Sequence, residues 1–172
     1  MFRFIVILAV FAACIYMGFY FGEVFKHRSV ELNEFQKALT LMNTEVLYAY
    51  TPLPLALLNI SNKLQNPVSD VFREISTMLE NGEVVSVYEG FHNSYTKHKD
   101  EFHLKEEDLR IVKDFFYSLG ESGVYGQEKI FQLTLDGLKR KYLEAENECK
   151  INRKMYRSLG ICIGAIIAIF FI

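Results

Sequence analysis

Two strongly apolar segments stand at the ends of this chain, and a more polar region with a helical pattern lies between them. The first segment, Phe4–Gly22, has no charged residue and would be about 28 Å long as a helix, close to the hydrocarbon thickness of a bilayer. The second, Leu159–Ile172, would be only about 21 Å long, so its length also fits a buried core helix or an interfacial helix. We predict transmembrane helices over residues 1–24 and 158–172 that flank a helical domain over residues 25–157.

Basic residues beside both apolar segments support insertion and indicate an orientation. Lysine and arginine side chains next to a membrane helix reach the headgroups, and cytoplasmic loops carry an excess of them. Lys26 and Arg28 follow the first segment, and a basic cluster precedes the second: Lys150, Arg153, Lys154 and Arg157. The pattern therefore predicts a cytoplasmic central domain in a cell membrane, with both termini on the opposite side.

Two other interpretations of the N-terminal segment compete with a transmembrane helix. A cleaved signal peptide has a shorter apolar core that ends at a small-residue site before polar sequence, whereas here the apolar run continues through Phe19 and Phe21. The run Phe11-Ala12-Ala13-Cys14 is weakly similar to a lipoprotein site, but hydrophobic residues follow it. We favour an uncleaved membrane helix.

Small residues form a stripe on each apolar segment. Gly18 and Gly22 share one helical face of the first segment, and Gly160 and Gly164 share one face of the second. Glycines four residues apart let the backbones of membrane helices approach closely, although glycine is common in such helices in any case. We predict that the two stripes pack together, within one chain or between copies of it.

Apolar residues recur with a helical period through the central region and predict six helices. In the first, Glu31, Glu34, Lys37 and Glu45 are expected on the solvent side, and the inward positions are Leu32, Phe35, Leu39, Met42 and Val46. Thr51-Pro52-Leu53-Pro54 should end this helix, because proline lacks a backbone donor and restricts the residue before it. The fold class is all-α.

Turn residues separate the remaining helices. A second helix, with Leu57 inward, should end at Asn66-Pro67, and Asn81-Gly82 should close a third. Residues 83–95 form a fourth helix, for which a strand is the alternative because its start is rich in valine. A fifth helix should end at Leu119, and the sixth should continue from Gln127 into the membrane, since no proline interrupts it.

Charge and motifs exclude several classes of function. The 172 residues include 19 Lys and Arg against 21 Asp and Glu, without a basic stripe away from the membrane, so nucleic-acid binding is not expected. The sequence has no Walker phosphate loop, Gly-x-Ser-x-Gly or His-Glu-x-x-His motif. Glu89 and His92 have the spacing of a di-iron ligand pair, but no second pair accompanies them, so we assign them to the surface. We expect no cofactor, no metal and no enzymatic activity.

An aromatic cluster late in the central region has two interpretations. Phe115, Phe116, Tyr117 and Tyr125 lie close together in the sequence. Core packing and anchoring at the membrane interface explain such a cluster, and so does a patch for docking a partner.

Several short motifs together resemble stage III sporulation protein AB. These motifs, whose order and spacing match along nearly the whole chain, are Glu45 with Tyr48 and Thr51-Pro52-Leu53, Leu119-Gly120, the Glu-rich run 143–148, Lys154-Met155-Tyr156 and Ser158-Leu159-Gly160. That family is in turn similar to the cytoplasmic domain of the inner-membrane platform protein F of type II secretion and type IV pilus systems. The resemblance implies an antiparallel six-helix cytoplasmic bundle, in agreement with the helices predicted from periodicity.

The resemblance also implies a function. It suggests a platform subunit in the channel complex between mother cell and forespore during endospore formation, located in the mother-cell membrane around the forespore. Implied partners are a secretion-type ATPase, other membrane proteins of the channel, the lipid bilayer and further copies of the chain, since the secretion protein has two such domains. The stretch from Thr51 to Leu57 resembles the helix-break motif of the platform protein. We expect Tyr48, Thr51, Pro52 and Leu53 to form either a helix break or a direct partner contact.

Three functional hypotheses follow. The leading one is a platform that docks the ATPase and couples it to the membrane through a stiff sixth helix. The second is a membrane-anchored helical scaffold without a motor partner, and the third is a membrane-bound enzyme. Copurification with an ATPase, with membrane proteins alone, or with a bound cofactor would distinguish them.

Overall fold

The structure is a computed structural model that describes residues 26–121 and 124–171. Within these ranges it contains six α-helices and no strand, which confirms the all-α prediction and excludes a strand at residues 83–95. The chain divides into a central unit, Val30–Tyr142, and a second unit formed by Met1–Ser29 and Leu143–Ile172. Each unit is described by itself below.

Residues 26–43 are helical, and their buried apolar face matches the predicted one. Leu32, Phe35, Leu39 and Met42 are completely buried. Glu31 and Glu34 were expected in solvent, but this prediction is wrong, because only 4% and 5% of these residues are exposed. Each carboxylate accepts backbone N–H groups from another part of the chain, as described below.

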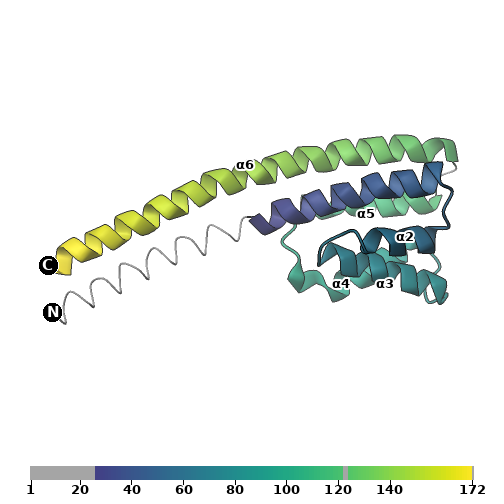
Figure 1. Ribbon diagram of the computed structural model, residues 1–172, viewed down its shortest axis with the longest axis horizontal. Helices are drawn as coiled ribbons and strands as arrows, with labels where there is room; N and C mark the ends of the chain where they lie inside the picture. Colours follow the sequence, from purple (N-terminus) through teal and green to yellow (C-terminus); the bar gives the residue numbers. More distant parts are fainter. Residues whose placement is uncertain (1–25, 122–123, 172) are drawn as a thin grey trace. The chain divides into compact units, whose positions relative to one another are not determined.

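The next three helices pack in sequence order within the central unit. They are α2 (Leu53–Ser61), α3 (Val68–Glu80) and α4 (Val87–Lys97), and α4 in turn packs against α5 (Glu106–Glu121). Short loops join them, and Figure 1 shows α2, α3 and α4 gathered on one side of the central unit. Gly90 on α4 allows close packing, since a methyl group there would lie 3.2 Å from the Ile75 side chain of α3.

Local chemistry sets the ends of α3 and α4. Gly82 has a φ of 69° and closes the turn after α3, where Glu83 N–H donates to Met78 O at 2.9 Å. The α4 helix begins later than the predicted residue 83, because Ser86 caps it by accepting from Glu89 N–H at 3.1 Å. The Glu89 carboxylate accepts from Val85 N–H at 3.0 Å, so this serine and glutamate form a capping pair.

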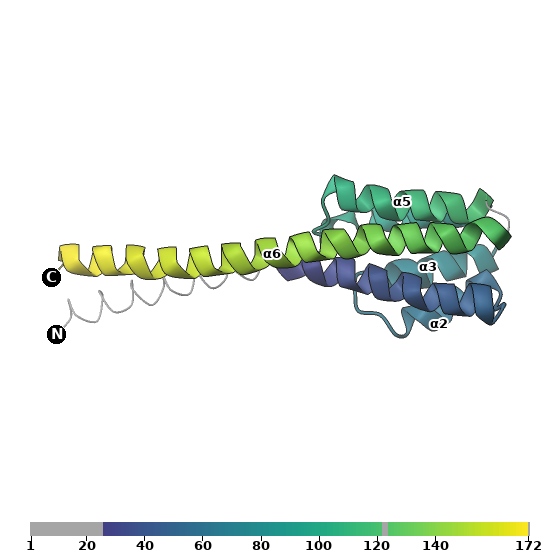
Figure 2. The ribbon, with the colours of Figure 1, turned by 90° about the horizontal axis from the view of Figure 1, so that it is seen from above.

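The long helix α6 (Val124–Phe171) is continuous, which confirms the prediction of an unbroken sixth helix. In Figure 2, α5 and the first part of α6 run side by side, and Lys141 of α6 pairs with Glu107 of α5. The ring of Phe131 lies 5.0 Å from the ring of Phe115, between centroids, and joins the same two helices.

Phe116 lies at the centre of an aromatic core in the central unit. Its ring stacks on Phe91 of α4 at 4.5 Å and meets the edge of Phe72 of α3 at 5.9 Å. Phe115 and Phe116 are both buried, whereas Tyr117 is 52% exposed. The aromatic cluster found in the sequence therefore divides into core residues and a surface residue.

No helix within residues 26–121 and 124–171 has a stretch that is both long enough and apolar enough to cross a membrane. The predicted helix over residues 1–24, with Gly18 and Gly22, lies outside the described residues. Gly160 and Gly164 lie in helical backbone near the end of α6.

Replacing Phe116 with alanine should reduce the free energy of unfolding by about 3–5 kcal/mol, because the cavity would open among three packed helices. Chemical denaturation followed by circular dichroism measures this loss. Leu133→Ala is the control, since Leu133 is 63% exposed and its truncation should change stability by less than about 0.5 kcal/mol. Equal effects of the two changes would contradict the assignment of Phe116 to the core.

Candidate functional site

Residues 44–54 form a sharp turn, here called the tyrosine turn, that joins the first described helix to α2 and includes the first two residues of α2. The α-helix changes to a π-helix over Thr44–Tyr48, where Ala49 N–H donates to Thr44 O at 3.1 Å. Tyr50 then adopts a φ of 52°, in the left-handed region that residues other than glycine rarely occupy. Short π-helices and residues in unfavourable backbone conformations both concentrate at functional sites.

Thr51 and Glu45 close the tyrosine turn. Thr51 N–H donates to Glu45 O at 2.9 Å, and the Thr51 hydroxyl donates to the Glu45 carboxylate at 2.9 Å. Pro52 then stands at the N-cap of α2, and Ser76 of α3 donates to Pro54 O at 2.7 Å. Because these bonds fix the backbone on both sides of Tyr50, its strained conformation persists.

The tyrosine turn exposes large aromatic and apolar side chains. Tyr48 is 68% exposed, Tyr50 is 78% exposed and Leu55, at the start of α2, is 50% exposed. Tyrosine is enriched at protein interfaces, because its ring buries a large area while its hydroxyl forms a hydrogen bond. Exposed aromatic side chains on a rigid backbone are suited to partner binding.

Two of the four predicted motif residues are half-buried, and the other two are exposed to solvent. Thr51 and Leu53 are half-buried, and Thr51 holds the turn through its bonds to Glu45, whereas Tyr48 and Pro52 are exposed. Tyr50 was not indicated by the sequence motif, although it is the more exposed tyrosine. An aromatic residue directly before a Thr-Pro helix break is the signal that could have identified it.

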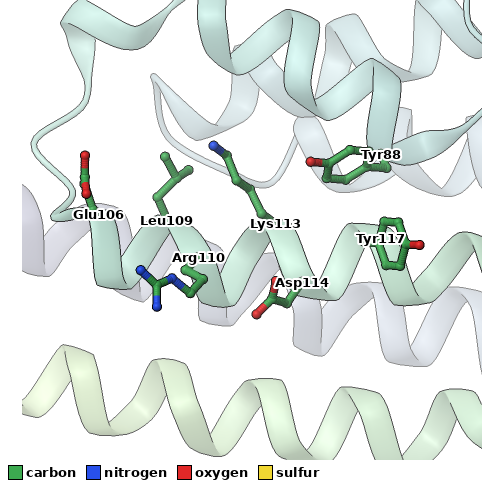
Figure 3. Close-up of a pocket in the computed structure, with 7 residues that line it drawn as sticks. All are labelled: Tyr88, Glu106, Leu109, Arg110, Lys113, Asp114 and Tyr117. Carbon is green, nitrogen blue, oxygen red and sulfur yellow. The ribbon is translucent and has the colours of Figure 1, made fainter.

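A pocket of about 420 Å³ lies between α4 and α5 (Figure 3). Only Tyr88 comes from α4, and the other lining residues come from α5: Glu106, Leu109, Arg110, Lys113, Asp114 and Tyr117. The rings of Tyr88 and Tyr117 meet edge to face at 5.6 Å and close one end. Glu106 lies at the other end, with the Lys113 side chain between them.

A charged network joins the end of α4 to α3. The Glu74 carboxylate accepts from Lys97, from His98 Nε2 at 3.2 Å and from the Ser94 hydroxyl at 3.0 Å. Burial acts to raise the pKa of Glu74, but these hydrogen bonds outweigh it and lower the pKa. The pKa of His98 is raised, first by its hydrogen bond to Glu101 and also by Glu74.

The buried Glu31 carboxylate joins the first described helix to the loop before α5. Both its oxygens accept from His103 N–H, at 3.1 and 2.9 Å, and Oε1 lies 2.9 Å from His103 Nδ1. Burial raises the pKa of Glu31 despite these bonds, and burial together with the charge of Glu31 raises the pKa of Tyr95. In the same way, Glu34 accepts from Gln65 N–H at 2.9 Å.

The second unit contains an ion pair between its two chain segments. Arg28 bonds Glu148 at 2.7 Å and Glu144 at 3.4 Å, and only 7% of the arginine side chain is exposed. Cys149 on α6 is half-buried.

The possible metal-ligand pair has other roles. Glu89 caps α4, and the His92 ring stacks on Tyr88 at 6.4 Å between centroids. Within the part of the chain that the structure describes, no group of three or more His, Cys, Asp or Glu side chains could hold a metal ion.

The fold and the tyrosine turn define a helical protein with a rigid, exposed aromatic surface. The stage III sporulation protein AB family model matches residues 3–172, so the chain belongs to this family. A relative of that name from Bacillus subtilis (strain 168) is 29% identical over 155 residues, which is 90% of each chain. A solved structure of stage III sporulation protein AB is 28% identical and has a TM-score of 0.67, covering 72% of this chain and 97% of the other. These similarities confirm the resemblance found in the sequence and support a role in sporulation.

Replacing Thr51 with valine should reduce the free energy of unfolding by about 0.5–1.5 kcal/mol, because the Glu45 carboxylate loses a hydrogen bond at similar side-chain volume. Thermal and chemical denaturation measure the loss. Thr96→Val is the control, since Thr96 is exposed and its hydroxyl donates to the His92 carbonyl one turn earlier in the same helix. If the two variants were equally stable, the Thr51–Glu45 bond would not be what holds the turn.

The stability contributed by His98 should depend on pH. Its raised pKa means that the contribution is complete below the unfolded pKa, about 6.5, and is lost as the pH rises through the higher folded value. Glu74, with its lowered pKa, keeps its contribution above about pH 4.3 and loses it at lower pH. His98→Gln should therefore destabilise the protein more at about pH 5.5 than at about pH 9.

Urea denaturation at both pH values measures this difference, with the exposed His92 replaced by glutamine as the control. A His98→Gln effect that stayed constant with pH would show that the network does not depend on the charge of His98.

Proposed function

We propose that this chain is a non-enzymatic platform subunit of the channel complex between mother cell and forespore. In this proposal it is anchored in the mother-cell membrane by residues 1–24 and 158–172, with the central unit in the cytoplasm. The central unit docks a secretion-type ATPase and couples it to the membrane. Other membrane proteins of the channel and further copies of the chain complete the complex.

The tyrosine turn is the observation that carries the ATPase-docking proposal. A π-helix, a strained Tyr50 and two highly exposed tyrosines coincide at the four-residue motif singled out from the sequence. A simple helix break requires only the prolines, so it does not explain why a strained residue carries an exposed aromatic ring. A binding surface explains both, because a fixed backbone presents the rings at little cost in entropy.

The continuity of α6 supports the coupling step. This helix supplies Val124–Tyr142 to the central unit and the following residues to the second unit, with helical backbone throughout. An α-helix without a proline has no natural break in its hydrogen bonds, so force applied to one part is transmitted along it. The buried Arg28 pair with Glu144 and Glu148 ties the other chain segment of the second unit to α6.

The double change Tyr48→Ser and Tyr50→Gly should reduce ATPase copurification at least about tenfold, because aromatic anchors contribute about 2 kcal/mol or more each. The folded protein should remain as stable or become more stable, since glycine relieves a left-handed strain of about 1 kcal/mol. Affinity purification of the full chain from sporulating cells, quantified by mass spectrometry, measures binding, and thermal unfolding measures stability.

Leu133→Ser is the matched control, because it removes another highly exposed apolar side chain from the same unit. Retained ATPase binding by the double variant would contradict docking at the tyrosine turn. If the unaltered chain copurified only with membrane proteins, a scaffold without a motor partner would replace the platform proposal.

A further inference from the structure

The pocket between α4 and α5 is separate from the tyrosine turn. The turn belongs to the π-helix Thr44–Tyr48 and the start of α2, whereas the pocket is lined by residues of α4 and α5. None of the pocket residues takes part in the proposed ATPase contact. The pocket therefore requires an explanation of its own.

Lys113 is the residue that gives the pocket its chemistry. The residue is half-buried, and within the described residues it forms neither an ion pair nor a hydrogen bond. Figure 3 shows Lys113 rising from α5 toward α4, with the Tyr88 hydroxyl pointing toward the lysine. An ammonium and a hydroxyl that line one pocket favour an anion, because both groups can donate to the same acceptor.

The two tyrosines at one end of the pocket favour an apolar group on the ligand. Tyr88 and Tyr117 meet edge to face at 5.6 Å, and the half-buried Leu109 lies on the same wall as Lys113. A ring or branched side chain placed there gains both burial and aromatic contact. The pocket thus combines a position for an anion at Lys113 with an apolar position at Tyr88 and Tyr117.

Size and charge limit the ligand to a small one with a single negative charge. The volume of about 420 Å³ holds one or two side chains. Arg110 and Lys113 are balanced by Glu106 and Asp114, so the pocket has no excess positive charge for a polyphosphate. The two carboxylates would repel a second anionic group on the ligand.

We propose that the pocket between α4 and α5 binds a peptide segment of a partner protein in which one acidic side chain stands next to an aromatic one. The carboxylate accepts from the Lys113 ammonium and the Tyr88 hydroxyl, and the neighbouring ring packs on Tyr88 and Tyr117. Arg110, Glu106 and Asp114 at the rim select against multiply charged segments.

The test uses the isotope-labelled full chain in detergent micelles and the blocked dipeptide N-acetyl-Glu-Phe-amide. Titration should shift the NMR signals of the Lys113 side chain and the Tyr88 ring with a Kd of about 1 mM, which is typical of so small a ligand. Lys113→Met should weaken binding at least about tenfold, and Tyr88→Phe about threefold to tenfold. Lys139→Met, on the exposed face of α6, should leave binding unchanged.

Two further probes determine the chemical class. N-acetyl-Gln-Phe-amide should bind at least about tenfold more weakly than the Glu peptide, and inorganic phosphate should give no saturable shift. Equal binding of the Gln peptide, or unchanged binding by both Lys113→Met and Tyr88→Phe, would overturn the proposal. Saturation by phosphate without the peptide effect would show a general anion site instead, and no shift with any probe would also overturn the proposal. ATPase copurification tests the tyrosine turn separately.

Discussion

The stacking of Phe116 on Phe91 is the contact on which the central unit depends. The two rings, whose centroids lie 4.5 Å apart, join α4 to α5. Phe72 of α3 packs on Phe116, and the ring of Phe131 of α6 packs on Phe115. Both the α4–α5 pocket and the network around Glu74 lie where α4 meets these neighbours. A single aromatic cluster therefore positions both features.

Periodicity predicted the helices well because apolar positions on one face of a helix require only a neighbouring surface. The burial of Leu32, Phe35 and Leu39 could be predicted without knowing which residues cover them. The burial of Glu31 and Glu34 was not predictable in this way. Their carboxylates accept backbone N–H groups of residues 72 and 31 positions away along the chain, and only the tertiary fold brings these groups together.

The candidate site could be located from the sequence, but not its shape. The two prolines marked the turn, and Thr51 and Tyr48 marked the motif. A π-helix leaves no periodic signal over five residues, and a tyrosine with positive φ is not specified by its own side chain. Tyr50 adopts that conformation because the Thr51–Glu45 bonds close the turn around it and the prolines that follow permit few alternatives. The pocket depends likewise on two helices meeting, and the sequence gives no sign of it.

Arg28 bonds two carboxylates that stand one helical turn apart on α6. A slide of α6 by one turn, about 5.4 Å, would leave only one of these two carboxylates beside the guanidinium. Rotation of α6 about its axis would remove both partners at once. These two ion pairs therefore oppose a rotation of α6 about its axis more strongly than a slide of α6 by one turn.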